Sequence, residues 1–236
     1  PDCDFPMLAK PSAGSGSDGI QILKNQADLD GFLVSGVLPK DWILQSYVEG
    51  PSYSLEIVGT PGNYTPLQVT DLEMDAVYDC KRVIAPTSLS DHLIQDFEAI
   101  AIRIAEGIRL RGLMDVEVIL HQGKLKVLEI DARLPSQTPT AVFCSCGINI
   151  LSAFASVFSM DVRRFQHHLA EPCGVIYEHI HVTPGSLEVI GERLISKAGP
   201  LTHHRNFYGA DEAISNFSPG MDEWLATLII KASDRD

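Results

Sequence analysis

The fold is decided by residues 116–133, which read Val116-Glu117-Val118-Ile119-Leu120-His121-Gln122-Gly123-Lys124-Leu125-Lys126-Val127-Leu128-Glu129-Ile130-Asp131-Ala132-Arg133. In the first half, Val116, Val118 and Leu120 alternate with other residues, as in a half-buried strand. A second apolar run begins directly after Gln122-Gly123, a pair suited to a tight turn. This pattern predicts a β-hairpin.

Both strands of the predicted hairpin carry acidic residues. Glu129 and Asp131 are two positions apart on an extended chain, so their side chains face the same way. A facing Glu117 would complete a cluster of hard oxygen ligands suited to Mg²⁺ that also bridges substrate phosphates. Arg133 follows at the same spacing and could hold a phosphoryl group or a carboxylate. The alternative is a solvated strand edge, which does not explain why the acids end the apolar run 125–130.

Upstream, a Ser/Gly-rich loop follows a short apolar run. Residues 5–9 and 20–23 predict two strands of a hairpin, and residues 12–19 form its flexible tip. Glycines let the backbone wrap around an oxyanion, and serines add donors. Lys10 precedes the loop and could reach a phosphate, although the loop is neither a Walker A motif nor a dinucleotide fingerprint. A plain Gly/Ser connector with a surface lysine is the alternative.

A third apolar run, residues 42–47, ends near an acidic residue and a glycine. Backbone at such a strand end can present an N–H and a C=O to the edge of adenine, and Glu49 could accept hydrogen bonds from ribose hydroxyls. The alternative is an ordinary buried strand followed by a turn. Before this run, Asn25 is expected to cap a short helix that carries Leu29, Phe32 and Leu33.

The remaining elements mix strands and helices without a strict βαβ alternation. Residues 53–58 and 67–72 predict strands, and Ser90 begins a helix with apolar residues three and four apart. A second apolar helix is expected within 140–160, and residues 174–182, 187–190 and 224–232 look like strands of a smaller C-terminal sheet. This order favours an α+β fold.

Composition excludes several classes of protein. The 236 residues are 45% apolar and 21% charged with a net charge of -13, which argues against a nucleic-acid-binding surface. No apolar run approaches a membrane span, the N-terminus is acidic and unlike a signal peptide, and the odd count of five cysteines favours reduced thiols in a cytoplasmic protein. A Zn²⁺ site of Cys144, Cys146, His179 and His181 is a disfavoured alternative, because the Cys-x-Cys spacing is tight and lies in an apolar, helix-like stretch.

Together, these segments resemble the ATP-grasp family in order and approximate spacing, over about residues 5–155. The loop after Lys10 is similar to the family's triphosphate lid, residues 45–50 to its adenine hinge, and residues 112–117 with 129–133 to its metal-binding hairpin. The resemblance implies an ATP-grasp fold, with the lid and hinge in residues 1–60 and the metal hairpin in residues 61–168. The strand pattern predicts a β-rich C-terminal part over residues 169–236. The separate N-terminal α/β domain usual in the family is expected to be absent from this chain.

Asp131 departs from the usual family form Glu-Ile-Asn-x-Arg. Four other stretches of the sequence are similar to the branch of the family that serves pyrrolysine biosynthesis: residues 78–83, 129–140, 177–180 and 207–214. That branch joins 3-methyl-D-ornithine to the side-chain amine of L-lysine with ATP. An added negative charge at Asp131 suits such diamino-acid substrates, whose ammonium groups an acidic pocket can bind.

The resemblance also implies roles for residues. The catalytic residues would be Lys10, on the α- or β-phosphate, and Arg133, on an acyl phosphate or the substrate carboxylate. ATP would be bound by Lys10, Ser12, Gly14, Ser15, Gly16, Ser17, Gln45, Ser46, Tyr47, Val48 and Glu49. Metal ligands would be Glu117, Glu129 and Asp131, for Mg²⁺ or alternatively Mn²⁺. The amino-acid substrates would be bound by Asp131, Arg133 and Ser136, and Glu73, Asp75 and Asp79 are weaker candidates for holding substrate amines. An exposed acidic loop is the alternative for these three.

Two competing functions stay open at this point. One is another ATP-grasp ligase, such as a D-alanine–D-alanine-type enzyme, or a carboxylase subunit. The other is a module that binds ATP without turnover, which would not need two metal carboxylates. Release of ADP and phosphate would separate an enzyme from such a module. The expected partners are ATP and small amino acids, with neither nucleic acid nor membrane, and a homodimer is one expected assembly.

Overall fold

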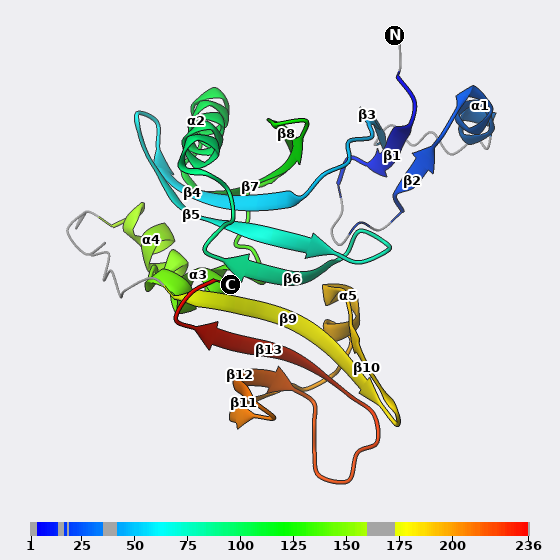
Figure 1. The fold of residues 1–236 in the computed structure, drawn as a ribbon. Coiled ribbons are helices and arrows are strands. Elements are labelled where there is room, and N and C mark those ends of the chain that lie inside the picture. The colour runs from blue at the N-terminus through cyan, green and yellow to red at the C-terminus, as the bar shows by residue number, and fades with distance from the viewer. Residues whose placement is uncertain (1–3, 14–16, 18, 35–41, 160–172, 236) are drawn as a thin grey trace.

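A computed structural model describes residues 4–13, 17, 19–34, 42–159 and 173–235. The described chain forms a three-stranded sheet and a ten-stranded sheet, and every recorded strand pair is antiparallel. Figure 1 shows the smaller sheet beside one end of the strands β4–β8.

The smaller sheet has the order β2-β1-β3, with strands β1 (Met7–Pro11), β2 (Gln21–Leu23) and β3 (Trp42–Ser46). Helix α1 (Gln26–Val34) follows β2, and the Asn25 side chain accepts a hydrogen bond from the Asp28 N–H at 3.1 Å, so the predicted cap is confirmed. The predicted hairpin of β1 and β2 is also confirmed. Leu29 and Phe32 pack with the apolar side of β1 in a small separate core.

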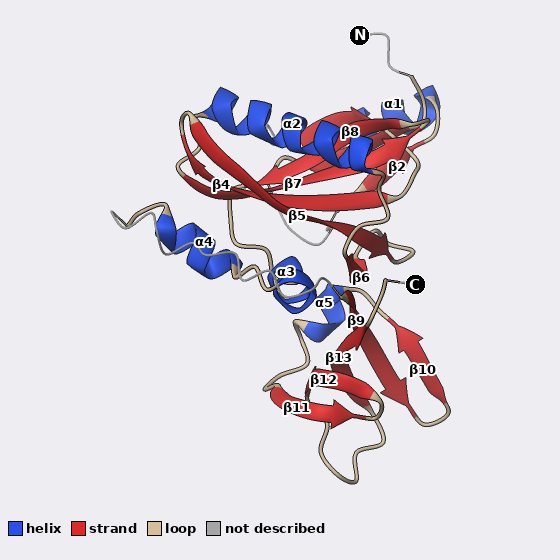
Figure 2. Ribbon diagram, turned by 60° about the vertical axis from the view of Figure 1, so that its left-hand side comes forward, coloured by secondary structure: helices blue, strands red, loops and turns tan. Residues whose placement is uncertain are grey.

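The larger sheet has the order β11-β12-β13-β9-β6-β5-β4-β7-β8, and β10 pairs with β9. Its upper half in Figure 1 consists of β4 (Ser52–Thr60), β5 (Asn63–Met74), β6 (Cys80–Ala85), β7 (Gly112–His121) and β8 (Lys124–Asp131). Helix α2 (Asp91–Ile108) lies along one face of these strands (Figure 2). It begins after Ser90 as predicted, and Phe97, Ala101 and Ala105 bury its apolar stripe against Val116 and Val118.

The C-terminal strands extend this same sheet. They are β9 (Gly174–Thr183), β10 (Ser186–Val189), β11 (Thr202–Phe207), β12 (Ala210–Ser215) and β13 (Trp224–Ala232), with the short helix α5 (Glu192–Ile195) between β10 and β11. The expectation of a separate small sheet is wrong, because β9 pairs along β6 from Arg82↔Glu178 to Ala85↔Val175. Strand β6 was not predicted, and it is the bridge between the two halves.

The expected division at 60/61 and 168/169 stays a prediction. Strands β4 and β5 pair across the first of these boundaries, with Thr60 opposite Asn63.

Between the smaller and larger sheets the chain passes very close to β7 at Gly50, where a Cβ would lie 2.1 Å from the Leu120 carbonyl oxygen. The close backbone approach, which only glycine permits, positions the two sheets around the space between them.

Two short helices, α3 (Thr138–Cys146) and α4 (Ile150–Ser156), lie where one predicted helix was expected. Within the described part of the chain, no single helix has the length and hydropathy of a membrane span. Helices α3 and α4 pass that test only as a pair, bent by 99°.

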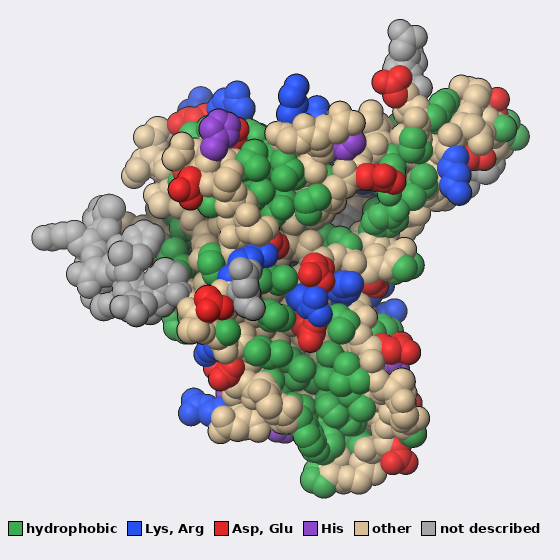
Figure 3. All heavy atoms as spheres, in the orientation of Figure 1, with side chains coloured by type: hydrophobic (Ala, Val, Ile, Leu, Met, Phe, Trp, Pro, Cys, Tyr) green, Lys and Arg blue, Asp and Glu red, His purple; other side chains and the backbone are tan. Residues whose placement is uncertain are grey.

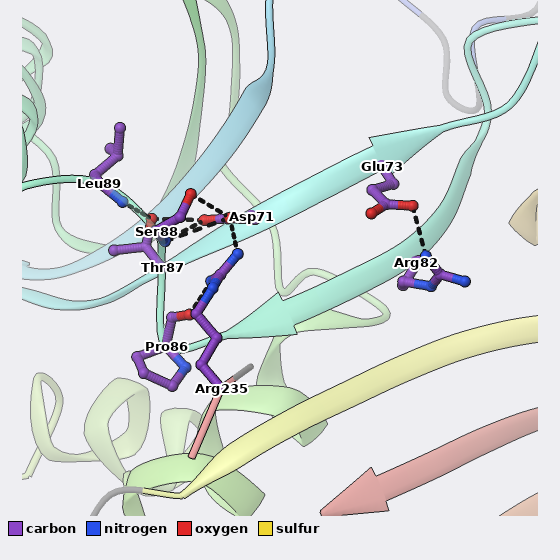
Figure 4. Close-up of polar contacts among 8 residues, drawn as sticks. All are labelled: Asp71, Glu73, Arg82, Pro86, Thr87, Ser88, Leu89 and Arg235. Carbon is purple, nitrogen blue, oxygen red and sulfur yellow. Dashed lines mark hydrogen bonds and ion pairs between the residues drawn. The ribbon is translucent and has the colours of Figure 1, made fainter. Parts of the chain in front are cut away.

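The end of the described chain returns to the middle of the large sheet. The Arg235 guanidinium donates to the Pro86 carbonyl oxygen and to the Asp71 carboxylate (Figure 4). Thr87 and Ser88 donate to the same carboxylate at 2.6 and 2.8 Å. Charged side chains of both signs also gather between the upper and lower parts of the molecule in the space-filling view (Figure 3).

Candidate functional site

A cavity lies between the two sheets. Strand β1 and the end of β3 form one side, and β7 and β8 form the other. Its apolar lining includes Leu8, Ile20, Val48, Ile119 and Leu128. Lys10, Glu117 and Glu129 stand among the polar lining residues. A largely apolar slot with a few convergent charges is typical of a small-molecule site. We call it the inter-sheet cavity.

Strands β7 and β8 pair with Glu117 opposite Glu129 and Asp115 opposite Asp131. Residues two apart on a strand share a face, so these four carboxylates lie on one face of the hairpin. Val118 opposite Val127 keeps the register set by the turn, and a register shift between Glu117 and Val118 places Glu117 opposite Glu129. The predicted hairpin and the facing of Glu117 toward Glu129 are therefore confirmed.

Burial and like charge act on the inner members of this group. Burial raises the pKa of Glu117 well above its ordinary value, and the neighbouring charges of Asp115 and Glu129 add to the effect. Burial also raises the pKa of Asp115 to about 6, although Ser54 donates to its carboxylate at 2.6 Å and opposes the shift. Such a concentration of destabilised carboxylates favours a cation beside them.

Lys10 connects the smaller sheet to the hairpin. Its ammonium donates to the Leu128 carbonyl oxygen at 3.2 Å and lies 3.6 Å from a carboxylate oxygen of Glu129. The Lys10 side chain is only 14% exposed, so its charge is held at the cavity. The cation thus lies within reach of any anionic group placed between the sheets.

Arg133, just beyond β8, pairs with Asp131 at 2.6 Å. Half of the Arg133 side chain is exposed, and it lines a second cavity that continues from the hairpin toward α3 and α5. Asp131 does not line that second cavity. The carboxylate of Asp131 therefore already has a cationic partner, and its expected role toward a substrate ammonium stays a prediction.

The expected hinge follows β3. Gln45, Ser46, Tyr47 and Val48 all line the inter-sheet cavity. The Tyr47 N–H donates to the Pro6 carbonyl oxygen at 3.1 Å, which leaves it unavailable to a nucleotide. The hydroxyls of Tyr47 and Tyr78 lie 3.1 Å apart; this hydrogen bond and burial raise the pKa of Tyr47 to about 12.

With this geometry in place, comparison with known proteins decides the family. Residues 3–137 match the family model described as an ATP-grasp domain. The chain belongs to the ATP-grasp family. The predicted α+β ATP-grasp fold is confirmed by this match and by the solved structures that share the fold.

Curated relatives extend the similarity beyond the matched domain. The chain is 32% identical over 233 residues to a protein of Methanosarcina acetivorans named 3-methyl-D-ornithine--L-lysine ligase, covering 98% of this chain and 60% of that protein. It is 36% identical over 192 residues to the Methanosarcina barkeri protein of the same name, covering 81% of this chain and 50% of the relative. The chain therefore spans at most about 60% of the length of these curated relatives.

Solved structures share the ATP-grasp fold at lower identity. A biotin carboxylase domain of Hydrogenobacter thermophilus 2-oxoglutarate carboxylase, crystallised with MgADP, ADP and bicarbonate, aligns with a TM-score of 0.68 at 20% identity, over 99% of this chain and 54% of that one. An L-amino acid ligase of Bacillus licheniformis aligns with a TM-score of 0.65 at 15% identity, over 99% of this chain and 59% of that one.

The ATP-grasp hairpin fits a magnesium ion by the chemistry of its donors. Mg²⁺ commonly uses one or two carboxylates and completes its shell with phosphate oxygens and waters. The facing pair Glu117 and Glu129 can supply these carboxylates. Among the described residues, no group of three His, Cys, Asp or Glu side chains is arranged to hold a metal. The three-ligand set with Asp131 stays a prediction, and the disfavoured zinc site has no such group either.

The expected lid falls partly outside the described residues. Gly14, Ser15 and Gly16 lie outside them. Ser12 lines an outer pocket shared with Lys10, Asp131 and Arg133. Ser17 lines the inter-sheet cavity, and its hydroxyl donates to the Tyr78 carbonyl oxygen at 2.6 Å.

The expected substrate residues are placed in different surroundings. Ser136 lines the second cavity. Glu73 pairs with Arg82 at 2.8 Å (Figure 4), and the Asp75 carboxylate accepts the backbone N–H groups of Val77 and Asp79. Neither Glu73 nor Asp75 lines the two cavities, and Glu49 is exposed outside them as well. Their assignments stay predictions.

Several residues at the site were missed by sequence reasoning. The sequence spacing could have indicated Asp115, because it stands two positions before Glu117 and shares its strand face. Glu56 also had a signal, as a single acid inside the apolar strand 53–58; it is fully buried opposite Asp115. Gln137 and Glu192, which line the second cavity, follow no spacing that could have singled them out.

Proposed function

We propose that the full-length protein is an ATP-dependent ligase that joins a carboxylate to an amine through an acyl phosphate. The proposal extends to substrates: 3-methyl-D-ornithine as the carboxylate donor and the side-chain amine of L-lysine as the acceptor. One observation carries the chemistry, which is that Lys10 of one sheet meets the Glu117–Glu129 pair of the other at a single cavity. The relatives named for this reaction support the choice of substrates.

The nucleotide would lie between the sheets. Gln45–Val48 and the apolar lining suit an adenine ring, and Lys10 would bind a phosphate oxygen, exchanging its contact with Glu129 for that anion. Mg²⁺ held by Glu117 and Glu129 would offset the charge on the phosphates. The chain's part is mainly positioning and charge neutralisation.

The carboxylate donor would lie beyond the phosphates, in the second cavity. There Arg133 can present its guanidinium to the carboxylate or to the acyl phosphate that forms when a carboxylate oxygen attacks the γ-phosphorus and ADP leaves. The neutral amine of lysine then attacks the acyl carbon, and phosphate departs. Ser136 lines the same cavity and offers a hydroxyl to this group.

The experiment is turnover by the full-length protein with ATP, Mg²⁺, 3-methyl-D-ornithine and L-lysine. We expect ADP and phosphate in equal amounts, with a product whose mass is the sum of both amino acids less one water. Omission of either amino acid, or use of Nε-acetyl-L-lysine, should stop product formation. Product from D-alanine instead would indicate another ATP-grasp ligase, and ATP binding without ADP release would indicate a non-catalytic module.

A further inference from the structure

The second cavity, which we call the acidic cavity, is lined by far more carboxyl groups than cationic groups. Its lining includes the carboxylates of Asp79, Asp115, Glu117, Glu129 and Glu192, and Arg133 is the cation among its described lining residues. Three of these acids belong to the β7–β8 hairpin. The other two come from a different wall, formed by the turn before β6 and by helix α5.

Asp79 is occupied in holding α5 in place. Its carboxylate is almost fully buried and accepts the Arg193 backbone N–H at 2.8 Å. Gly191 packs directly on it, since a Cβ there would lie 2.2 Å from an Asp79 carboxylate oxygen. Asp79 therefore positions the start of α5, and Glu192, the first residue of that helix, stands at the cavity.

Glu192 has no hydrogen-bond or ion-pair partner among the described residues. The Glu192 charge acts on the pKa of Cys80 and Asp79 beside the cavity and of Tyr177 and His179 on β9. Burial lowers the pKa of His179 to about 4, so this imidazole is neutral at neutral pH. By contrast, Glu129 lies near Lys10 and Asp131 pairs with Arg133. Outside the hairpin, Glu192 is thus a carboxylate of this cavity that has no cationic partner among the described residues.

A neighbouring amide gives an independent indication of a ligand. Gln137 lines the same cavity and is only 6% exposed, yet its side-chain oxygen has no hydrogen-bond partner within the described part of the chain. A buried acceptor without a donor is costly, and native structures rarely leave one. A ligand that brings N–H groups would satisfy it.

We propose that Glu192, together with the Gln137 amide oxygen, binds the side-chain ammonium of a diamino-acid substrate. The inference rests on the proposed function, because the reacting carboxylate must lie near Arg133 and the hairpin. A side-chain ammonium several bonds from that carboxylate then reaches the opposite wall of the acidic cavity, where Glu192 lies. The amine of the acceptor must be neutral to attack, so the ammonium bound by Glu192 belongs to the carboxylate donor. Glu192 lies beyond the matched domain, residues 3–137, so the C-terminal part sets substrate choice.

The test compares D-ornithine with D-norvaline, which has the same carbon chain without the terminal amine. In the full-length protein, Glu192→Gln should raise KM for D-ornithine roughly ten- to hundredfold, as expected for loss of a charge-assisted hydrogen bond. KM for ATP and for D-norvaline should change less than about twofold. Gln137→Met should give a smaller loss of the same selectivity. Glu188→Gln removes an exposed carboxylate from nearby β10 and should leave all values unchanged.

Calorimetric titration of D-ornithine and D-norvaline into the protein with a non-hydrolysable ATP analogue separates this inference from the proposed function. Weaker binding of D-ornithine alone by Glu192→Gln supports the inference, whether or not the wild type turns over. Equal losses for both amino acids, or none, would overturn it. A wild type that binds D-ornithine through Glu192 but releases no ADP with lysine would overturn only the proposed function.

Discussion

Glu56 lies in the middle of β4, fully buried, on the sheet face that also carries Asp115 and Glu117. Thr138 donates to one of its carboxylate oxygens, and the other has no partner among the described residues. Burial raises the pKa of Glu56 from 4.5 to about 8, with the nearby charge of Asp115 adding to the shift. The side chain is therefore held as a neutral acid at neutral pH.

This shift predicts a pH dependence of stability. The folded protein keeps the Glu56 proton while the unfolded chain loses it above pH 4.5, so the contribution is fully present below 4.5 and is lost as pH rises to about 8. The free energy of unfolding should fall by about 1 kcal/mol per pH unit within this window. Glu56→Gln keeps an acceptor for Thr138 and should remove that slope. Urea unfolding at pH 5 to 9 checks it, and parallel slopes in both proteins would refute it.

Glu129 gives a second prediction at the scale of one residue. Glu129→Gln should lower kcat by at least about 100-fold, because it removes a carboxylate that neutralises charge with the metal in the transition state. ATP affinity should fall much less, since Lys10 and the apolar cavity remain. Steady-state kinetics at saturating Mg²⁺ measures both, with Glu188→Gln as the matched control. Near-normal kcat would remove Glu129 from the mechanism.

Residue-scale prediction from sequence succeeded where a spacing rule applied. The glycine turn at 122–123 and strand alternation suffice to predict the hairpin, but a regular ladder from that turn would put Glu117 opposite Leu128. The register shift between Glu117 and Val118, which no spacing rule reveals, places Glu117 opposite Glu129. Spacing rules also do not reveal Glu192, whose approach to the cavity depends on contacts between Asp79 and α5 more than 100 positions apart in sequence. Such contacts have no local signature.

At the scale of elements, strands with clear apolar alternation were predicted and β6 was not. Residues 80–85 mix Cys80, Lys81 and Arg82 with apolar residues, and their polar members are satisfied only in the folded sheet. Arg82 pairs with Glu73 of β5 and Glu178 of β9, one neighbour on each side. Without β6, the C-terminal strands could only be read as a separate sheet.

The contact between Arg235 and Asp71 of β5 gives a prediction at the scale of elements, because it joins the end of the described chain to the large sheet. Arg235→Gln should lower the free energy of unfolding by about 1–3 kcal/mol, because the partly buried Asp71 loses a charged donor while keeping Thr87 and Ser88 (Figure 4). Arg205→Gln, at an exposed position on β11, should change it by no more than about 0.5 kcal/mol. Chemical unfolding of both variants measures these free energies. Equal changes in the free energy of unfolding would show that the contact does not stabilise the sheet.

For the whole molecule, the family could be recognised from motif order, because segments that resemble the lid, hinge and hairpin follow one another in the sequence, and the family match over residues 3–137 confirms the family. The arrangement that brings Lys10 to within 3.6 Å of Glu129 could not, since it depends on how two sheets are joined at Gly50. The expected cytoplasmic location and homodimer stay predictions.

The central claim is that a carboxylate is activated as an acyl phosphate. The most direct measurement uses the full-length protein with ATP, Mg²⁺, L-lysine and 3-methyl-D-ornithine labelled with ¹⁸O in its carboxylate, followed by mass analysis of the phosphate and nucleotide products. Attack of the carboxylate on the γ-phosphorus predicts transfer of one ¹⁸O atom to inorganic phosphate for each product molecule. Label in AMP, or amide product accompanied by unlabelled phosphate, would contradict it.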